Sequence, residues 1–146
     1  MSQRDEQGQV TLLIIGFAGI LLMAIVVVVD ASAAYLQRQG LDNLADGAAL
    51  YGADLGSAAI YEQGLGDSRL AQQEEAVEQA VRDYLARADA GARFPGIDVG
   101  VRVDPVGRSV TVRLEAPLDL PLTIPGSPSN PMVGASSTAA VTLVVR

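Results

Sequence analysis

The sequence of 146 residues contains no cysteine, no histidine, no lysine and no tryptophan. The missing cysteine excludes a disulfide framework, a thiolate nucleophile and any zinc or iron–sulfur site held by thiolates. The missing histidine and lysine remove the imidazole base, the Schiff-base amine and the lysine that binds phosphate. Carboxylates and hydroxyls remain, and their spacing reveals no catalytic arrangement. We therefore predict no enzymatic activity, no cofactor and no metal site.

Positive charge is also scarce, because ten arginines stand against 17 acidic residues and the formal net charge is −7 at pH 7. A surface this acidic repels the phosphates of nucleic acids and the headgroups of anionic lipids. We therefore predict that nucleic acid is not a partner of this chain.

One long apolar run is present near the beginning of the sequence. Residues 10–29, VTLLIIGFAGILLMAIVVVV, contain no charged side chain. A helix of this length rises about 1.5 Å per residue and covers the roughly 30 Å hydrocarbon core of a bilayer. We predict a transmembrane helix over 10–29 that follows a short tail over 1–9. A short tail before one span is the layout of a signal-anchor, which predicts a cytoplasmic tail and an extracytoplasmic remainder.

Two cleavage sites would change the mature chain. An Ala-x-Ala site ending at Ala33 fits signal peptidase, and its use would release a soluble protein that begins at Ala34. Cleavage after Gly8, as in type IV prepilins, would make Gln9 the first residue. The fifth residue after that cut is Leu13, where prepilins carry a glutamate. The uncleaved chain and both cleaved chains remain open at this point.

The residues after the span predict that the helix continues as a stalk over 30–55, because this range is rich in Ala, Leu and Gln and contains no proline. Gly40 and Gly47 each cost such a helix about 1 kcal/mol relative to alanine, so we expect a bend there. Spacings of 3, 4, 3 and 4 mark a packing seam. The seam requires a partner, either the chain's own sheet or a neighbouring subunit's helix. Its members are Leu41, Leu44, Ala48, Tyr51 and Leu55.

Two acidic residues stand out by their positions. Asp30 directly follows four valines at the end of the span, and Asp46 interrupts the alanine-rich part of the seam. A carboxylate near lipid strongly prefers a hydrogen-bond donor. Asp30 is therefore either a solvated marker of the end of the span or a polar partner of another subunit's helix end.

Residues 56–146 are expected to form an α+β head. The glycine-rich range 56–68 predicts a loop, and the range from residue 69 to about residue 90 has the pattern of an amphipathic helix. Such a helix most often covers a sheet. The apolar residues that share one of its faces are Leu70, Val77, Ala80, Val81, Tyr84 and Leu85.

From Ile97 the apolar residues alternate with polar ones, which predicts a β-hairpin whose strands are joined by residues 105–108. Five prolines make 117–131 an irregular segment, and alternation over 139–145 predicts a third strand. The expected fold is thus α+β. A transmembrane helix extends into a helical stalk and is followed by an amphipathic helix and a small antiparallel sheet of about three strands.

The N-terminal residues also form a recognisable order. A short charged tail precedes an apolar helix that ends in Val-Asp, and a Leu-x-Asn-x-Ala-Asp-x-Ala-Ala-Leu helix follows. This order resembles the N-terminal module of Tad (tight adherence, Flp pilus) assembly proteins of the TadE/TadG type. The hairpin, the proline-rich segment and a final strand of small residues beginning near Ala135 resemble that family more loosely. The matching residues are Gly8-Gln9-Val10, Val29-Asp30, Tyr35-Leu36, Arg38, Leu41, Asn43, Ala45-Asp46 and Ala48-Ala49-Leu50.

The resemblance implies a structural protein with a pilin-like layout. It implies a minor pilin or pseudopilin-like component of the bacterial cytoplasmic membrane that helps to assemble a thin pilus or a related secretion filament. Its implied partners are other pilus or secretion subunits that pack on the N-terminal helix as homo- or hetero-oligomers. Two other functions remain open, a membrane-tethered extracytoplasmic binding module and a secreted soluble protein released after Ala33.

Overall fold

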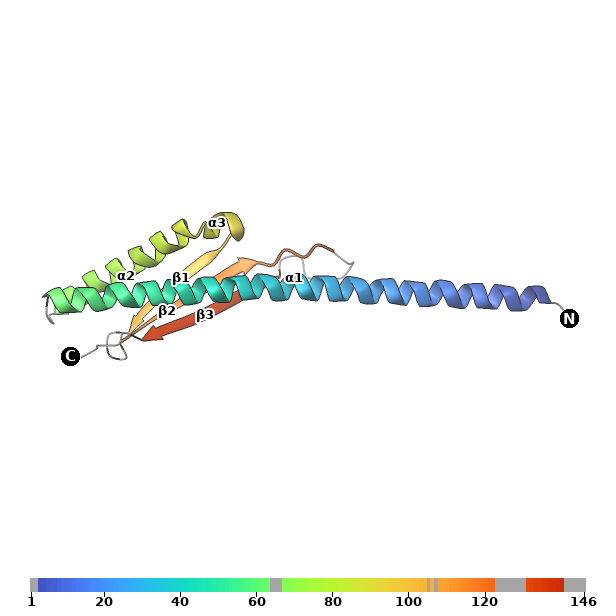
Figure 1. Cartoon of the computed structure of the whole chain (residues 1–146), viewed down its shortest axis with the longest axis horizontal. Helices are drawn as coiled ribbons and strands as arrows, with labels where there is room; N and C mark the ends of the chain where they lie inside the picture. The colour runs from blue at the N-terminus through green and yellow to red at the C-terminus, as the bar shows by residue number, and fades with distance from the viewer. Residues whose placement is uncertain (1–2, 64–66, 105, 107, 123–130, 141–146) are drawn as a thin grey trace. The chain divides into compact units, whose positions relative to one another are not determined.

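The computed structural model describes residues 3–63, 67–104, 106, 108–122 and 131–140, with side chains described from Gln9 onward and not over 56–73. Contacts divide the chain into two units, Met1–Tyr35 with Asp119–Ser127 and Leu36–Leu118 with Pro128–Arg146. The α+β layout is the predicted one. Its elements, labelled in Figure 1, are α1 (Gln3–Gln63), α2 (Asp67–Arg87), α3 (Ala90–Arg93), β1 (Asp98–Asp104), β2 (Ser109–Pro117) and β3 (Met132–Ala140).

The first unit contains the apolar run, which is helical over its whole length as predicted. No residue over 10–29 is buried, and all of its large apolar side chains except Val26 are exposed. An α-helix satisfies its own backbone hydrogen bonds, which lipid requires of any segment that spans it. α1 is therefore long and apolar enough to cross a membrane. It begins at Gln3, so residues 3–9 of the expected tail are helical as well.

The second unit has a core between α1, α2 and the sheet. Gly52 on α1 marks the point where all three meet, since a Cβ there would lie 3.1 Å from Val81 and 3.3 Å from Val77 and Val110. The core combines small residues of α1 with branched apolar residues of the other elements. Its largest fully buried side chains are Leu41, Leu114, Val81, Val110 and Val112.

Two other glycines of α1 were expected to bend the helix, and the helix instead runs through both of them. A Cβ on Gly40 would lie 3.0 Å from the Phe94 ring, and a Cβ on Gly47 would overlap the Tyr84 hydroxyl. Gly40 therefore makes room for the ring of Phe94, the residue after α3. Gly47 makes room for the hydroxyl of Tyr84 on α2. This close packing offsets the cost of glycine in a helix.

The connection between the first two helices is shorter than predicted. The range 56–68 was expected to be a loop, but α1 continues to Gln63 and α2 begins at Asp67, which leaves residues 64–66 outside the described structure. Residues 58–63 are Ala-Ala-Ile-Tyr-Glu-Gln, a run without glycine or proline. One glycine at position 56 costs only about 1 kcal/mol, which is too little to end a helix with good helix formers on both sides.

α2 is amphipathic as predicted. Val77, Ala80, Val81 and Leu85 are buried at helical spacing, Tyr84 is half-buried, and the side chain of Leu70 lies outside the described residues. The outer face carries hydrogen bonds between residues four apart, from Gln79 to Asp83 and from Arg82 to Glu78, each at 2.9 Å. Burial of the apolar stripe therefore holds α2 on the core, as expected of a helix that covers a sheet.

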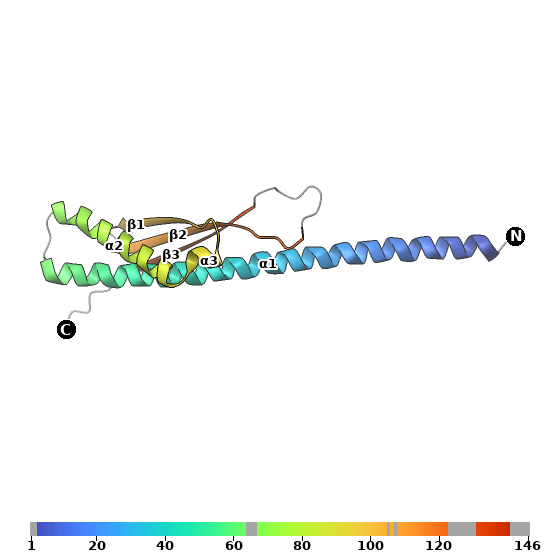
Figure 2. The same ribbon diagram turned by 90° about the horizontal axis from the view of Figure 1, so that it is seen from above.

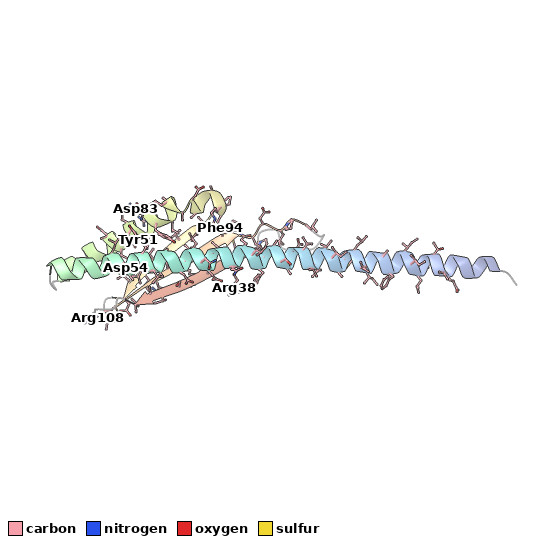
Figure 3. The ribbon with its side chains drawn as sticks, in the orientation of Figure 1. Arg38, Tyr51, Asp54, Asp83, Phe94 and Arg108 are labelled. Atoms are coloured by element: carbon pink, nitrogen blue, oxygen red, sulfur yellow. The ribbon has the colours of Figure 1, made fainter. Side chains whose placement is uncertain are left out.

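α2 ends at Arg87, three residues before the expected end. Asp89 adopts φ 54°, in the left-handed region that aspartate tolerates better than most residues. The chain then forms α3, and the Phe94 N–H donates to the Ala90 carbonyl at 2.8 Å. This turn delivers Phe94 to the core, where it is buried against Gly40 (Figure 3).

The sheet has the order β1-β2-β3 and is antiparallel throughout. Asp104 pairs with Ser109, so residues 105–108 join the strands of the predicted hairpin. Figure 2 shows the strands nearly edge-on, with α1 along one side of them. β2 alternates buried and more exposed residues, and Thr111 of its outer face is 2.9 Å from Thr138 of β3 between the hydroxyl oxygens. One face thus belongs to the core and the other to solvent.

The third strand lies earlier in the chain than predicted. Strand β3 is Met132–Ala140, whereas the alternation had indicated 139–145, of which 141–145 lie outside the described residues. The inward positions of β3 are occupied by Val133, Ala135, Ser137 and Ala139, and the residues between them are glycine, serine and threonine. Alanine and serine differ little in apolarity, so the sequence of β3 shows no clear alternation of apolar and polar residues. Strand pairing with β2 nevertheless buries both alanines.

The convergence at Gly52 predicts a loss of stability when the residue is enlarged. Gly52→Val adds three carbons against Val77, Val81 and Val110. Overpacking of this kind costs about 1–3 kcal/mol, so the free energy of unfolding should fall by that amount. Denaturant unfolding of the full chain in detergent, followed by circular dichroism, measures this change. Gly91→Ala on α3 meets no atom within 4 Å, and it should leave stability unchanged or slightly raised. Equal losses in both variants would contradict the packing described at Gly52.

Candidate functional site

The predicted seam lies partly in the core of the second unit. Leu41, Leu44 and Ala48 are buried, Tyr51 is half-buried, and Leu55 is 42% exposed. The contacts of α1 at its glycines are with α2, the sheet and Phe94. Of the two partners considered for the seam, the chain's own core is therefore the one that the structure contains.

The buried residues of α1 follow a different period from the predicted seam. They form two rows with a spacing of four residues, 41-45-49-53 and 44-48-52. Rows of this spacing are inclined to the helix axis, as when ridges of one helix pack obliquely against another element. A seam with a mean spacing of 3.5 residues would run along the axis instead. Tyr51 and Leu55 belong to that axial seam and lie outside the inclined rows.

Tyr51 forms an aromatic cluster with α2 at the edge of the core. Its ring centroid is 5.7 Å from that of Tyr84, and the Arg87 guanidinium carbon is 4.8 Å from the Tyr51 centroid. A hydrogen bond with the Tyr51 hydroxyl raises the pKa of Arg87 above its ordinary value. Figure 3 labels Tyr51 together with Asp83, which contributes to the same shift more weakly. Tyr51 thus joins α1 to α2 within the chain.

The opposite face of α1 is solvent-exposed. Asn43, Asp46 and Leu50 are exposed, and Leu50 is 61% exposed despite its apolar side chain. Asp46 forms neither a hydrogen bond nor an ion pair with any other residue of the described ranges. The neighbouring Asp42 faces Arg38 at 3.9 Å, a long ion pair between exposed side chains that contributes little to stability. Among the described residues this face offers an exposed apolar side chain, Leu50, and a carboxylate, Asp46, without a partner.

Asp30 has a partner that neither sequence interpretation included. Its Oδ1 accepts a hydrogen bond from the backbone N–H of Leu122 at 3.1 Å, and both residues belong to the first unit. Asp30 is half-buried, whereas Leu122 is 39% exposed. The two residues are 92 positions apart in the chain, so no local pattern could have identified the pair.

The residues of both candidate cleavage sites lie within α1. Gly8 and Gln9 are in its first turns, and Gln9 is exposed. Ala33 and Ala34 are half-buried and belong to an uninterrupted helical stretch. Which chain is the mature one therefore stays a prediction.

Comparison with known proteins identifies one family. Residues 8–55 match the Tad family model, described as Flp pilus-assembly TadE/G-like, which confirms the resemblance found in the sequence over that segment. The match covers the apolar run and both faces of α1 described above, about a third of the chain. No curated protein and no solved structure matches the chain.

The position of the seam in the core predicts a difference between the two faces of α1. Leu41→Ala removes a fully buried side chain and should lower the free energy of unfolding by about 2–5 kcal/mol. Leu50→Ala, on the exposed face of the same helix, should change it by less than about 0.5 kcal/mol. Denaturant unfolding of both variants in the same detergent makes the comparison. A loss at Leu50 as large as that at Leu41 would show that the exposed face already has a partner.

Proposed function

We propose that this protein is a membrane-anchored structural component of a Tad/Flp-type pilus or a related secretion machinery, with a minor-pilin or pseudopilin-like role. The observation that carries this proposal is that the segment matching the pilus-assembly family coincides with the helix whose apolar surface is left uncovered. The helix supplies the membrane anchor, and its exposed face beyond the span supplies the contact with other subunits.

The exposed apolar surface supports the anchor. An uncharged run of 20 residues over 10–29, exposed at every position but Val26, is unfavourable in water, because large apolar patches on soluble proteins are normally covered. Lipid covers such a run without any further protein. A pilin-like helix stored in lipid could later exchange its lipid contacts for packing against sister helices, a step in which Gly16 and Gly19 allow close approach.

The two faces of α1 support the contact with other subunits. In the matched segment the buried Leu41, Ala45, Ala48 and Ala49 already have a role, since they form the inner side of the core. Asn43, Asp46 and Leu50 belong to the same motif, yet they are exposed and take no part in the core that the described residues form. We assign these three residues to the assembly surface. Asp30, included in the sequence prediction, is assigned instead to a contact within its own chain.

The proposed topology has residues 1–9 in the cytoplasm, the span over 10–29 in the cytoplasmic membrane, the stalk over 30–55 and the head over 56–146 outside the cytoplasm. The acidic, cysteine-free head is compatible with an extracytoplasmic location. The head presents strands whose described outer face carries Thr111, Arg113 and Thr138, a polar surface suited to solvent.

Membrane fractionation in the native host tests the anchor. We expect the uncleaved or Gln9-starting chain in the membrane fraction, with its mature N-terminus read from the intact mass. Ile20→Arg places a charge at the centre of the span at a cost of about 2.5–3.5 kcal/mol, which should reduce the membrane-bound fraction. Val106→Arg, on the exposed connection between β1 and β2, is the matched control and should not reduce it. An Ala34-starting chain in the culture medium would refute the anchored form.

Site-specific photo-crosslinking tests the assembly surface. A photoreactive residue at Leu50 should form an adduct with a pilus-assembly subunit or with a second copy of this chain, identified by mass spectrometry of the adduct. The same residue at Ala86, on the exposed side of α2 and outside the matched segment, is the control. Equal adducts at both positions, or none at Leu50 in cells that assemble the pilus, would contradict the assignment.

A further inference from the structure

We propose that residues 117–122, which begin at the last residue of β2, are a second membrane contact, in which Leu122 inserts into the zwitterionic interface of the bilayer beside the end of the span. The hydrogen bond between the Asp30 carboxylate and the Leu122 N–H holds the segment there. This inference rests on the proposed membrane anchor, and it assigns a lipid-binding role to a segment outside the family match.

The first argument is depth. Asp30 is the first charged residue after the 20 apolar residues of the span, so its carboxylate lies where the hydrocarbon core ends. The Leu122 nitrogen is 3.1 Å from that carboxylate, and both residues belong to the first unit. Leu122 is therefore held at the level of the lipid interface whenever the span is in a membrane.

The second argument is the backbone of the segment. Irregular chain is costly next to lipid because each unpaired N–H group loses its hydrogen bond with water. Pro117 and Pro121 have no N–H group. The Leu118 N–H donates to the Pro131 carbonyl at 2.7 Å, and the Leu122 N–H donates to Asp30. Most of the donors of this segment are thus absent or satisfied, as an interfacial segment requires.

The third argument is the composition of the segment. Residues 117–122 are Pro-Leu-Asp-Leu-Pro-Leu, with three leucines and no basic residue. The single charge is that of Asp119, so electrostatic attraction to anionic lipid is not available. Leu122 keeps 39% of its surface exposed although it is apolar and held in place. Contact with the membrane must therefore come from apolar insertion, and uncharged zwitterionic lipid should suffice.

The natural absence of cysteine allows a direct test with the full chain in phosphatidylcholine vesicles. Leu122→Cys carries an environment-sensitive fluorophore, Ile20→Cys is the reference inside the span, and Val106→Cys, at a residue that is 93% exposed, is the reference in water. We expect the label at position 122 to emit at shorter wavelength than that at 106. It should also be quenched by a nitroxide attached near the lipid headgroup and shielded from iodide in solution.

Each outcome separates this inference from the proposed anchor. If the label at position 20 is quenched by lipid nitroxide and the label at 122 behaves like that at 106, the anchor stands and the lipid contact is refuted. If the label at position 20 is itself accessible to iodide, the anchor fails and the inference fails with it. If phosphatidylglycerol is needed before the label at 122 becomes quenched, attraction by charge replaces apolar insertion and the proposal is wrong.

Variants of Asp30 test what holds the segment. Asp30→Asn keeps an oxygen that can accept from the Leu122 N–H, whereas Asp30→Ala removes it. In the Leu122→Cys chain, we expect the alanine variant to lose nitroxide quenching and to gain exposure to iodide, and the asparagine variant to keep the original signals. The label at position 20 should be unchanged by both. Unchanged quenching at 122 in the alanine variant would show that Asp30 does not position the segment.

Discussion

The close approach of α1 to its neighbours is the interaction on which the second unit depends. On the inner face of α1, alanines and glycines are interspersed with only two leucines, Leu41 and Leu44. Because Gly52 has no Cβ, branched side chains of α2 and β2 reach the helix backbone itself. The bulk of the core is supplied from the other side, by valines of α2 and β2 and by Phe94. α1 thus contributes small side chains to the core, and α2, β2 and Phe94 contribute the larger ones.

This division explains why one helix can serve two environments. Small residues need little lateral space, so the inner face is fully used by the chain's own core. Large apolar residues are concentrated in 10–29, where the described part of the chain leaves them exposed. Leu36 and Leu50 are exceptions beyond the span, exposed on a face that the core leaves free. Their exposure costs the isolated chain free energy, which a partner on that face would recover.

The sequence predicts those elements whose apolar period is strong. The run over 10–29 and the valine alternation of the hairpin are unambiguous, because large apolar residues contrast sharply with their neighbours. Strand β3 was displaced in the prediction because alanine, serine and glycine give almost no contrast. The loop predicted over 56–68 is too long, because glycine does not by itself end a helix. The free energy that one glycine costs is small beside the stability gained when the helix continues. The contrast in apolarity between neighbouring residues therefore decides which secondary-structure elements the sequence predicts correctly.

The candidate site shows a different limit, because a family motif mixes residues with unrelated physical roles. Leu41, Ala45, Ala48 and Ala49 are buried and pack within the chain. Asn43, Asp46 and Leu50 occupy the same motif without an internal partner among the described residues. Spacing cannot separate the two sets, since the axial seam and the inclined rows share Leu41, Leu44 and Ala48. Once the fold is known, the exposed residues of the motif can be told apart from those that form the core, and it is to the exposed ones that we assign assembly.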